Sequence, residues 1–144
     1  MKHRSWACVL AFPLVLCVAL VVVGGCAKPI FTVVDKKLCK GVDGSGKPLE
    51  PTTVFAPADG RACLWFSYRN AGAGQVLKAK FTHVDPLGTE ATDEVETELK
   101  AGSHSGVVEL TGQDGAPLAA GKYTVELKNQ SDVSYGPPLS FTVQ

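Results

Sequence analysis

Apolar and polar residues alternate along residues 61–70, 76–84 and 121–128, and again along residues 139–143. In an extended chain successive side chains point to opposite faces, so this alternation predicts β-strands with at least one buried face. Along residues 61–70 one face carries Ala62, Leu64, Phe66 and Tyr68, and the other carries Cys63, Trp65, Ser67 and Arg69. The pattern leaves open which of these two faces belongs to the core.

Turn-forming residues separate the alternating segments. Residues 43–46 read Asp-Gly-Ser-Gly, and residues 57–60, 70–74 and 85–88 are also rich in glycine, proline, aspartate or asparagine. Shorter strands are expected at residues 31–38 and 107–111, and small polar residues predict turns at 101–106 and 112–115. Many short strands between turns are typical of an all-β sandwich or barrel.

The densest charge cluster lies within residues 89–100, where acidic residues surround only two large apolar ones, Val95 and Leu99. We expect an edge strand here, because edge strands are commonly protected by charge. The spacing of Val95 and Leu99 is also compatible with a helix, and a loose crossover remains open. In a strand, Glu94, Glu96 and Glu98 would share one face. A solvated face is the simplest interpretation, and contact with a cation or a basic partner is the alternative.

The N-terminal segment has a different pattern. Lys2 and Arg4 precede an uncharged apolar stretch at residues 6–23, as in a secretory signal. The stretch is near the lower limit of about 17 to 25 residues for a membrane span, so an uncleaved anchor is one alternative and a plain secreted protein another. The tetrapeptide Val23-Gly24-Gly25-Cys26 resembles the lipobox of bacterial lipoproteins. That resemblance implies cleavage before Cys26 and a diacylglyceryl group on its thiol.

This interpretation divides the chain into three parts. Residues 1–25 form a lipoprotein signal peptide, residues 26–30 form a short lipid-anchored tether, and residues 31–144 form one domain. Cleavage would leave 119 of the 144 residues, with 12 basic and 14 acidic side chains and a net charge of −2. This charge offers no basic surface for nucleic acid, so nucleic-acid binding is not expected.

Three cysteines remain after the predicted cleavage: Cys26, Cys39 and Cys63. If Cys26 carries lipid, the other two form an even pair, which in an oxidising compartment predicts one structural disulfide. A disulfide between Cys39 and Cys63 would close a loop of about 25 residues, which stabilises a protein by roughly 3 kcal/mol through the entropy of the unfolded chain. A metal pair or a redox pair is the competing interpretation, but the sequence contains no CxxC motif.

A second resemblance concerns the fold. Residues 117–127, followed by Phe141-Thr142-Val143, resemble the last two strands of bacterial extracytoplasmic immunoglobulin-like domains, and residues 63–68 resemble an inner strand. The resemblance implies a single immunoglobulin-like antiparallel β-sandwich. It also implies that Gly121-Lys122-Tyr123 is the tyrosine corner of that fold, with a buried ring whose hydroxyl bonds to the backbone. Cys39 and Cys63 do not lie where the antibody bridge would be.

Motifs for chemistry are sparse. The predicted mature chain has two histidines, His83 and His104, which with Asp85 could hold a metal only if the fold joined them. The sequence has no HExxH motif, no GxSxG nucleophile elbow and no phosphate-binding glycine loop. We therefore predict no catalytic residues, no metal site and no cofactor, and we expect that the protein is not an enzyme.

The expected function is a lipid-anchored, non-catalytic binding or protein-interaction module of the cell envelope, with an envelope protein as partner and strand edges and end loops as the contact surface. The alternative is a carbohydrate- or small-ligand-binding module that uses Trp65 and Tyr68, provided that Trp65 is not covered. Ala27 stands where an aspartate would resemble an inner-membrane retention signal, so the lipobox resemblance implies the outer membrane in a Gram-negative host.

Overall fold

The computed structural model describes residues 27–144, which form a sandwich of two β-sheets. The predicted signal peptide (residues 1–25) and Cys26 lie outside the described residues. One sheet has the order β2-β1-β4-β7, and its strands are β1 (Thr32–Val42), β2 (Pro48–Pro51), β4 (Arg61–Ala71) and β7 (Gly102–Thr111). The other has the order β3-β9-β8-β5-β6, with β3 (Val54–Phe55), β9 (Leu139–Val143), β8 (Gly121–Asn129), β5 (Val76–Val84) and β6 (Glu90–Glu98).

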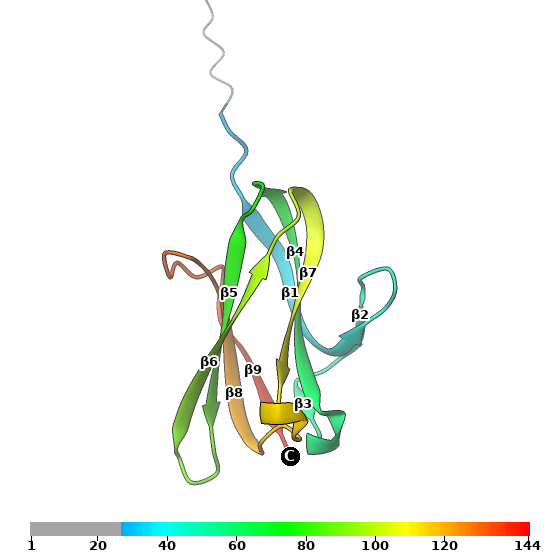
Figure 1. Ribbon diagram of the computed structural model, residues 1–144, viewed down its shortest axis with the longest axis vertical. Coiled ribbons are helices and arrows are strands. Elements are labelled where there is room, and N and C mark those ends of the chain that lie inside the picture. Colours follow the sequence, from blue (N-terminus) through cyan, green and yellow to red (C-terminus); the bar gives the residue numbers. More distant parts are fainter. Residues whose placement is uncertain (1–26) are drawn as a thin grey trace, which may run out of the picture.

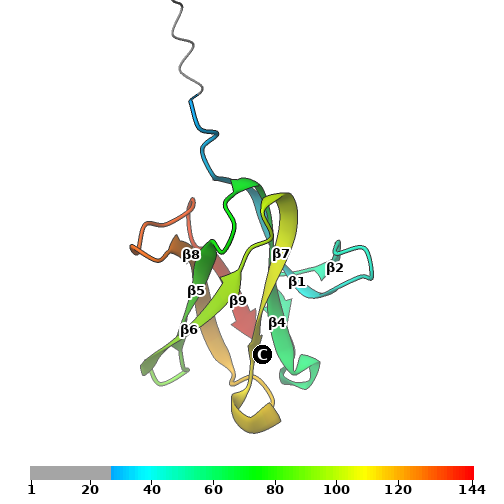
Figure 2. The same cartoon turned by 45° about the horizontal axis from the view of Figure 1, so that its top comes forward.

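Residues 27–31 and the C-terminal residue lie at opposite ends of the sandwich (Figures 1 and 2). The end that carries the C-terminus also holds the β5–β6 turn and two 3-10 turns, η1 (Pro57–Asp59) and η2 (Gln113–Gly115). All strand pairs are antiparallel except β3 with β9. No helix within residues 27–144 has the length and apolar character needed to cross a bilayer.

The core lies between the two sheets, and the residues in it show which face of residues 61–70 is buried there. The face with Leu64, Phe66 and Tyr68 packs into the core cluster, against Leu77 and Phe81 of the opposite sheet. The expected alternation is confirmed in β5 by the buried residues Leu77, Ala79 and Phe81, and in β8 by Tyr123, Val125 and Leu127. Burial of such side chains contributes about 1.5–3 kcal/mol each, which makes this interface the main source of stability.

Two expectations about local structure are resolved by strand pairing. Residues 89–100 contain a strand, β6, which pairs with β5 along its whole length. Residues 101–106 are not a turn, as their small polar side chains predict, because residues 102–106 form the first half of β7. There Ser105 pairs with Ser67 and His104 with Tyr68 of β4. Pairing with a neighbouring strand outweighs a weak local preference, because β propensity depends strongly on context.

Candidate functional site

Cys39 and Cys63 face each other from adjacent strands. They are register partners in the β1–β4 pair and both are completely buried, but both are free thiols, so the disulfide predicted from the sequence is absent from this structure. Burial raises the pKa of the Cys63 thiol to about 12, and the nearby Glu109 carboxylate adds to this rise. Burial also raises the pKa of the Cys39 thiol. The disulfide remains a prediction for the protein in an oxidising compartment. Residues directly opposite each other on antiparallel strands have the spacing that a disulfide needs.

Trp65 and Tyr68 do not form one binding platform. Trp65 lies on the outer face of its sheet and is half-buried beneath the β1–β2 hairpin, where its indole N–H donates to the Gly46 carbonyl at 2.7 Å. Tyr68 is buried in the core, and its hydroxyl bonds to the main chain of Lys100. The predicted ligand-binding role of Tyr68 is therefore wrong, because a side chain on the inner face of a sandwich cannot stack on a sugar outside it.

The two histidines are also far apart in the fold. His83 is at the end of β5 near the C-terminal end of the sandwich, while His104 is at the start of β7 near the tether (Figure 1). Each ring already contacts a backbone carbonyl at 3.1 Å, His83 that of Ala120 and His104 that of Ala101. Within residues 27–144 no three histidine, cysteine or acidic residues are grouped as metal ligands are.

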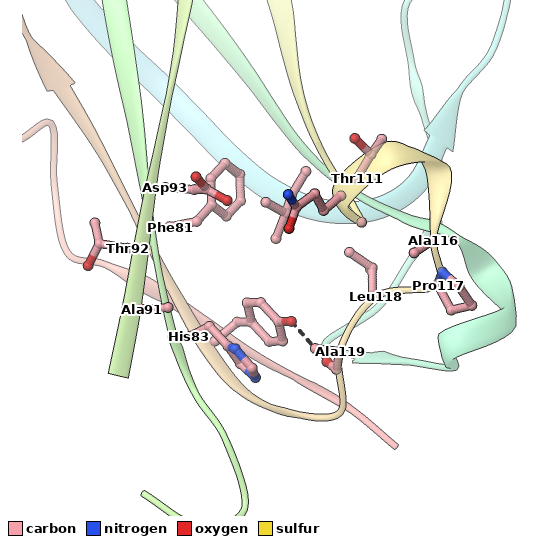
Figure 3. A pocket seen from close by; sticks show the side chains of 14 residues that line it. Phe81, His83, Ala91, Thr92, Asp93, Thr111, Ala116, Pro117, Leu118 and Ala119 are labelled. Carbon is pink, nitrogen blue, oxygen red and sulfur yellow. Dashed lines mark hydrogen bonds between the residues drawn. The ribbon is translucent and has the colours of Figure 1, made fainter. Parts of the chain in front are cut away.

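The tyrosine corner is present at the start of β8. The Tyr123 ring is buried, and its hydroxyl donates to the Ala119 carbonyl at 2.8 Å, the bond marked at Ala119 in Figure 3. The ring is stacked between His83 and Phe141, with centroid distances of 4.3 and 4.7 Å. Burial raises the pKa of the Tyr123 phenol, so the group remains a neutral donor at physiological pH. Tyr123 thereby fixes the β7–β8 connection against β5.

Replacing Tyr123 with phenylalanine should lower the free energy of unfolding by about 1 to 3 kcal/mol, because the Ala119 carbonyl loses its donor while the ring stack remains. In denaturant titrations the midpoint should fall at an unchanged slope, since the surface exposed on unfolding stays the same. An unchanged midpoint would contradict the structural role assigned to this hydroxyl.

A cleft opens where the β7–β8 connection crosses between the two sheets (Figure 3). We call it the end cleft. Its volume is about 390 Å³. Buried side chains that belong to the core form its floor: Phe81, Leu110, Leu118 and Tyr123. Exposed polar side chains form its rim: Asp93, Thr111 and Gln113. An apolar floor with a few polar groups is the usual composition of a binding cleft.

Strand β6 forms one wall of the end cleft and is the last strand of its sheet. Its residues alternate in direction: in Figure 3 the Asp93 side chain points to the same side as Phe81, toward the cleft, whereas Thr92 points away from it. The Asp93 carboxylate forms no ion pair or hydrogen bond with any side chain or backbone group of residues 27–144. The cleft therefore carries one free negative charge above an apolar floor.

Sequence reasoning missed the end cleft as a site. Its floor combines Phe81 from β5, Leu110 from β7 and Leu118 from the β7–β8 connection, and each of these residues has the pattern of an ordinary core position. The sequence feature that pointed to the cleft is the acidic segment at residues 89–100, for which contact with a cation or a basic partner was the alternative to a solvated face.

No family of known proteins matches the chain by sequence, and no curated protein is similar to it by sequence. Among solved structures, an immunoglobulin-like protein from Pseudomonas aeruginosa is similar, with 16% identity, a TM-score of 0.58, and coverage of 82% of this chain and 99% of that one. The alkylpurine DNA glycosylase AlkC from Pseudomonas fluorescens, bound to DNA containing an abasic site analog, has 16% identity and a TM-score of 0.52 over 82% of this chain and 31% of that one. At this identity the similarity concerns the fold alone, and it confirms the predicted immunoglobulin-like sandwich.

Proposed function

We propose that the protein is a non-catalytic binding module of the cell envelope, held at the membrane by lipid on Cys26 and binding an envelope protein through the end cleft and its edges. The observation that carries the proposal is the position of the cleft. Residues 27–31 leave the sandwich at one end, and η2 lies at the other end (Figures 1 and 2). Gln113 of η2 lines the cleft, so the cleft also lies at that other end. A lipid anchor just before residue 27 would hold the cleft away from the membrane surface.

The chemistry of the cleft supports binding rather than catalysis. A general base needs a free basic atom within reach of a nucleophile or substrate. At the cleft, Nε2 of His83 contacts the Ala120 carbonyl and the Tyr123 hydroxyl donates to the Ala119 carbonyl, so both atoms hold the β7–β8 connection. The acid of the cleft, Asp93, has no nucleophilic side chain hydrogen-bonded to it among residues 27–144. The immunoglobulin-like fold adds support by analogy, since its end loops and strand edges serve many binding proteins.

The lipid anchor is tested by replacing Cys26 with serine. The wild-type protein should start at Cys26 and carry the added mass of acyl chains, whereas the Cys26→Ser variant should accumulate as a precursor that still begins at Met1. Mass spectrometry of the N-terminal peptide measures both. Cys17→Ser is the matched control, because Cys17 lies inside the predicted signal peptide and its loss should leave processing unchanged. A wild-type protein with an intact Met1 would refute the anchor.

The binding role is tested by site-specific photo-cross-linking in intact cells. A photoreactive residue at Ala116, an exposed position on the rim of the end cleft, should form a discrete cross-link to an envelope protein. The same residue at Asn70, an exposed position near the tether end, is the control and should give far less product. Equal products at the two positions, or none at Ala116, would contradict the proposal.

A further inference from the structure

The free edge of β6 has a regular pattern of available backbone groups. At the two ends of the β5–β6 pair, the Asp85 N–H donates to the Thr89 carbonyl and the Leu99 N–H donates to the Gln75 carbonyl. The register between these ends is uninterrupted, so the odd-numbered residues of β6 bond to β5. The even-numbered residues therefore direct their N–H and C=O groups to the open edge of the sheet: Glu90, Thr92, Glu94, Glu96 and Glu98.

The side chains of the same even-numbered residues lie on the outer face of the sheet, where Glu94 and Glu96 are directly opposite lysines of β5. The β5–β8 pair is mixed, because Lys78 is also opposite Lys128. In one row across the sheet Glu126 of β8 is opposite Lys80 of β5, which is opposite Glu94 of β6. In the next row Lys78 is opposite Glu96. Opposite charges on directly paired residues are favourable and like charges are not. A strand added beyond β6 would therefore be favoured if it placed basic residues opposite Glu94 and Glu96.

The other face of an added strand would lie toward the end cleft. The odd-numbered residues of β6 point inward, and Asp93 lies in register with the core residue Phe81 at the cleft. Inward-pointing residues of an added strand would continue this face, over the floor formed by Leu110 and Leu118. Apolar side chains suit this floor, and the free carboxylate of Asp93 suits an additional cation at one position.

We propose that β6 accepts an extended segment of the envelope partner as an additional strand, and that this segment alternates basic and apolar residues. The proposal rests on the proposed function and specifies its partner. A second copy of this chain does not fit, because pairing β6 with β6 would place glutamates opposite glutamates. The acidic edge thus prevents self-association, as charged edges commonly do, and selects a basic strand from a partner.

The test uses the full-length protein in detergent and two peptides that match β6 in length, one alternating lysine with valine and the other alternating glutamate with valine. The lysine peptide should bind, more weakly as salt is added, and it should shift the amide signals of Glu94 and Glu96 in NMR spectra. The glutamate peptide should bind at least about tenfold more weakly, because its charges would oppose those of β6. Equal binding of both peptides, or no binding of either, would overturn the proposal.

Two substitutions at Thr92 test how much the backbone of β6 contributes to peptide binding. Thr92→Pro removes an N–H that points to the open edge and leaves the β5–β6 hydrogen bonds intact. This variant should therefore bind the lysine peptide about tenfold more weakly than the wild-type protein does. Thr92→Val keeps this N–H and is the matched control, with affinity expected to stay within about twofold. Equal affinities of these two variants would show that the edge is not used. If Thr92→Pro fails to fold, the paired reversal Glu94→Lys and Glu96→Lys decides, because it should exchange the preference between the two peptides.

The outcomes also distinguish this proposal from the function on which it rests. Cross-links at Ala116 without binding of the lysine peptide would reject strand addition and leave the envelope-binding function in place. Binding of the lysine peptide without any cellular cross-link would reject the function and leave the edge chemistry in place.

Discussion

Replacing Gly121 with alanine should lower the free energy of unfolding by about 3 kcal/mol. Gly121 has a φ of +146°, and a Cβ atom there would lie 2.5 Å from the Val84 carbonyl oxygen and 2.5 Å from Nε2 of His83. Both contacts are far inside van der Waals distance, and the first is to backbone of the paired strand β5. The ring stack and the tyrosine corner must therefore shift, or β8 must separate from β5 at this point.

Gly60→Ala is the matched control for that measurement. Gly60 also has a positive φ, +70°, but a Cβ atom there would meet nothing within 4 Å. Its replacement should cost only the backbone strain of the left-handed conformation, about 1 kcal/mol. Chemical denaturation of the three proteins gives both values. If the two variants lose the same stability, the close approach of Gly121 to β5 has no energetic weight.

Oxidation of the Cys39–Cys63 pair should have a comparably large effect. In protein recovered from an oxidising compartment, non-reducing peptide mapping should find the two cysteines joined, and reduction should lower the free energy of unfolding by about 3 kcal/mol. Because the thiols are buried and the pKa of Cys63 is about 12, the native reduced protein should react with iodoacetamide far more slowly than the unfolded chain. Free thiols in the exported protein would refute the disulfide.

The Cys39–Cys63 pair also predicts that the stability of the reduced protein and that of the oxidised protein depend differently on pH. The pKa of the Cys63 thiol is raised from an ordinary value of 9.0 to about 12 in the folded protein, so folding favours the protonated form. The associated stability is fully present below pH 9 and is lost as the pH rises from 9 toward 12. Reduced protein should therefore lose stability over this interval, whereas oxidised protein has no thiol to ionise there. Thermal melts of both forms across this pH range provide the comparison.

The sequence predicted the strands whose residues alternate and the turns between them. The predicted segment 76–84 coincides with β5, and Tyr123 occupies the buried position expected of a tyrosine corner. The beginning of β7 was missed because Ser103 and Ser105 have no apolar alternation, and pairing with β4 alone makes them a strand. The end cleft was missed for a related reason, since its residues come from three segments whose proximity is decided by sheet topology.

The parallel pair of β3 with β9 connects the first half of the chain to its last strand, with Val54 opposite Thr142. Strand β9 also lies between β3 and β8, so the second sheet is incomplete until this strand is available. Folds dominated by pairings between distant segments form slowly, in milliseconds to seconds. A chain truncated before β9 would leave β3 unpaired and β8 with an open edge, so we expect the second sheet to form only after the last strand is available.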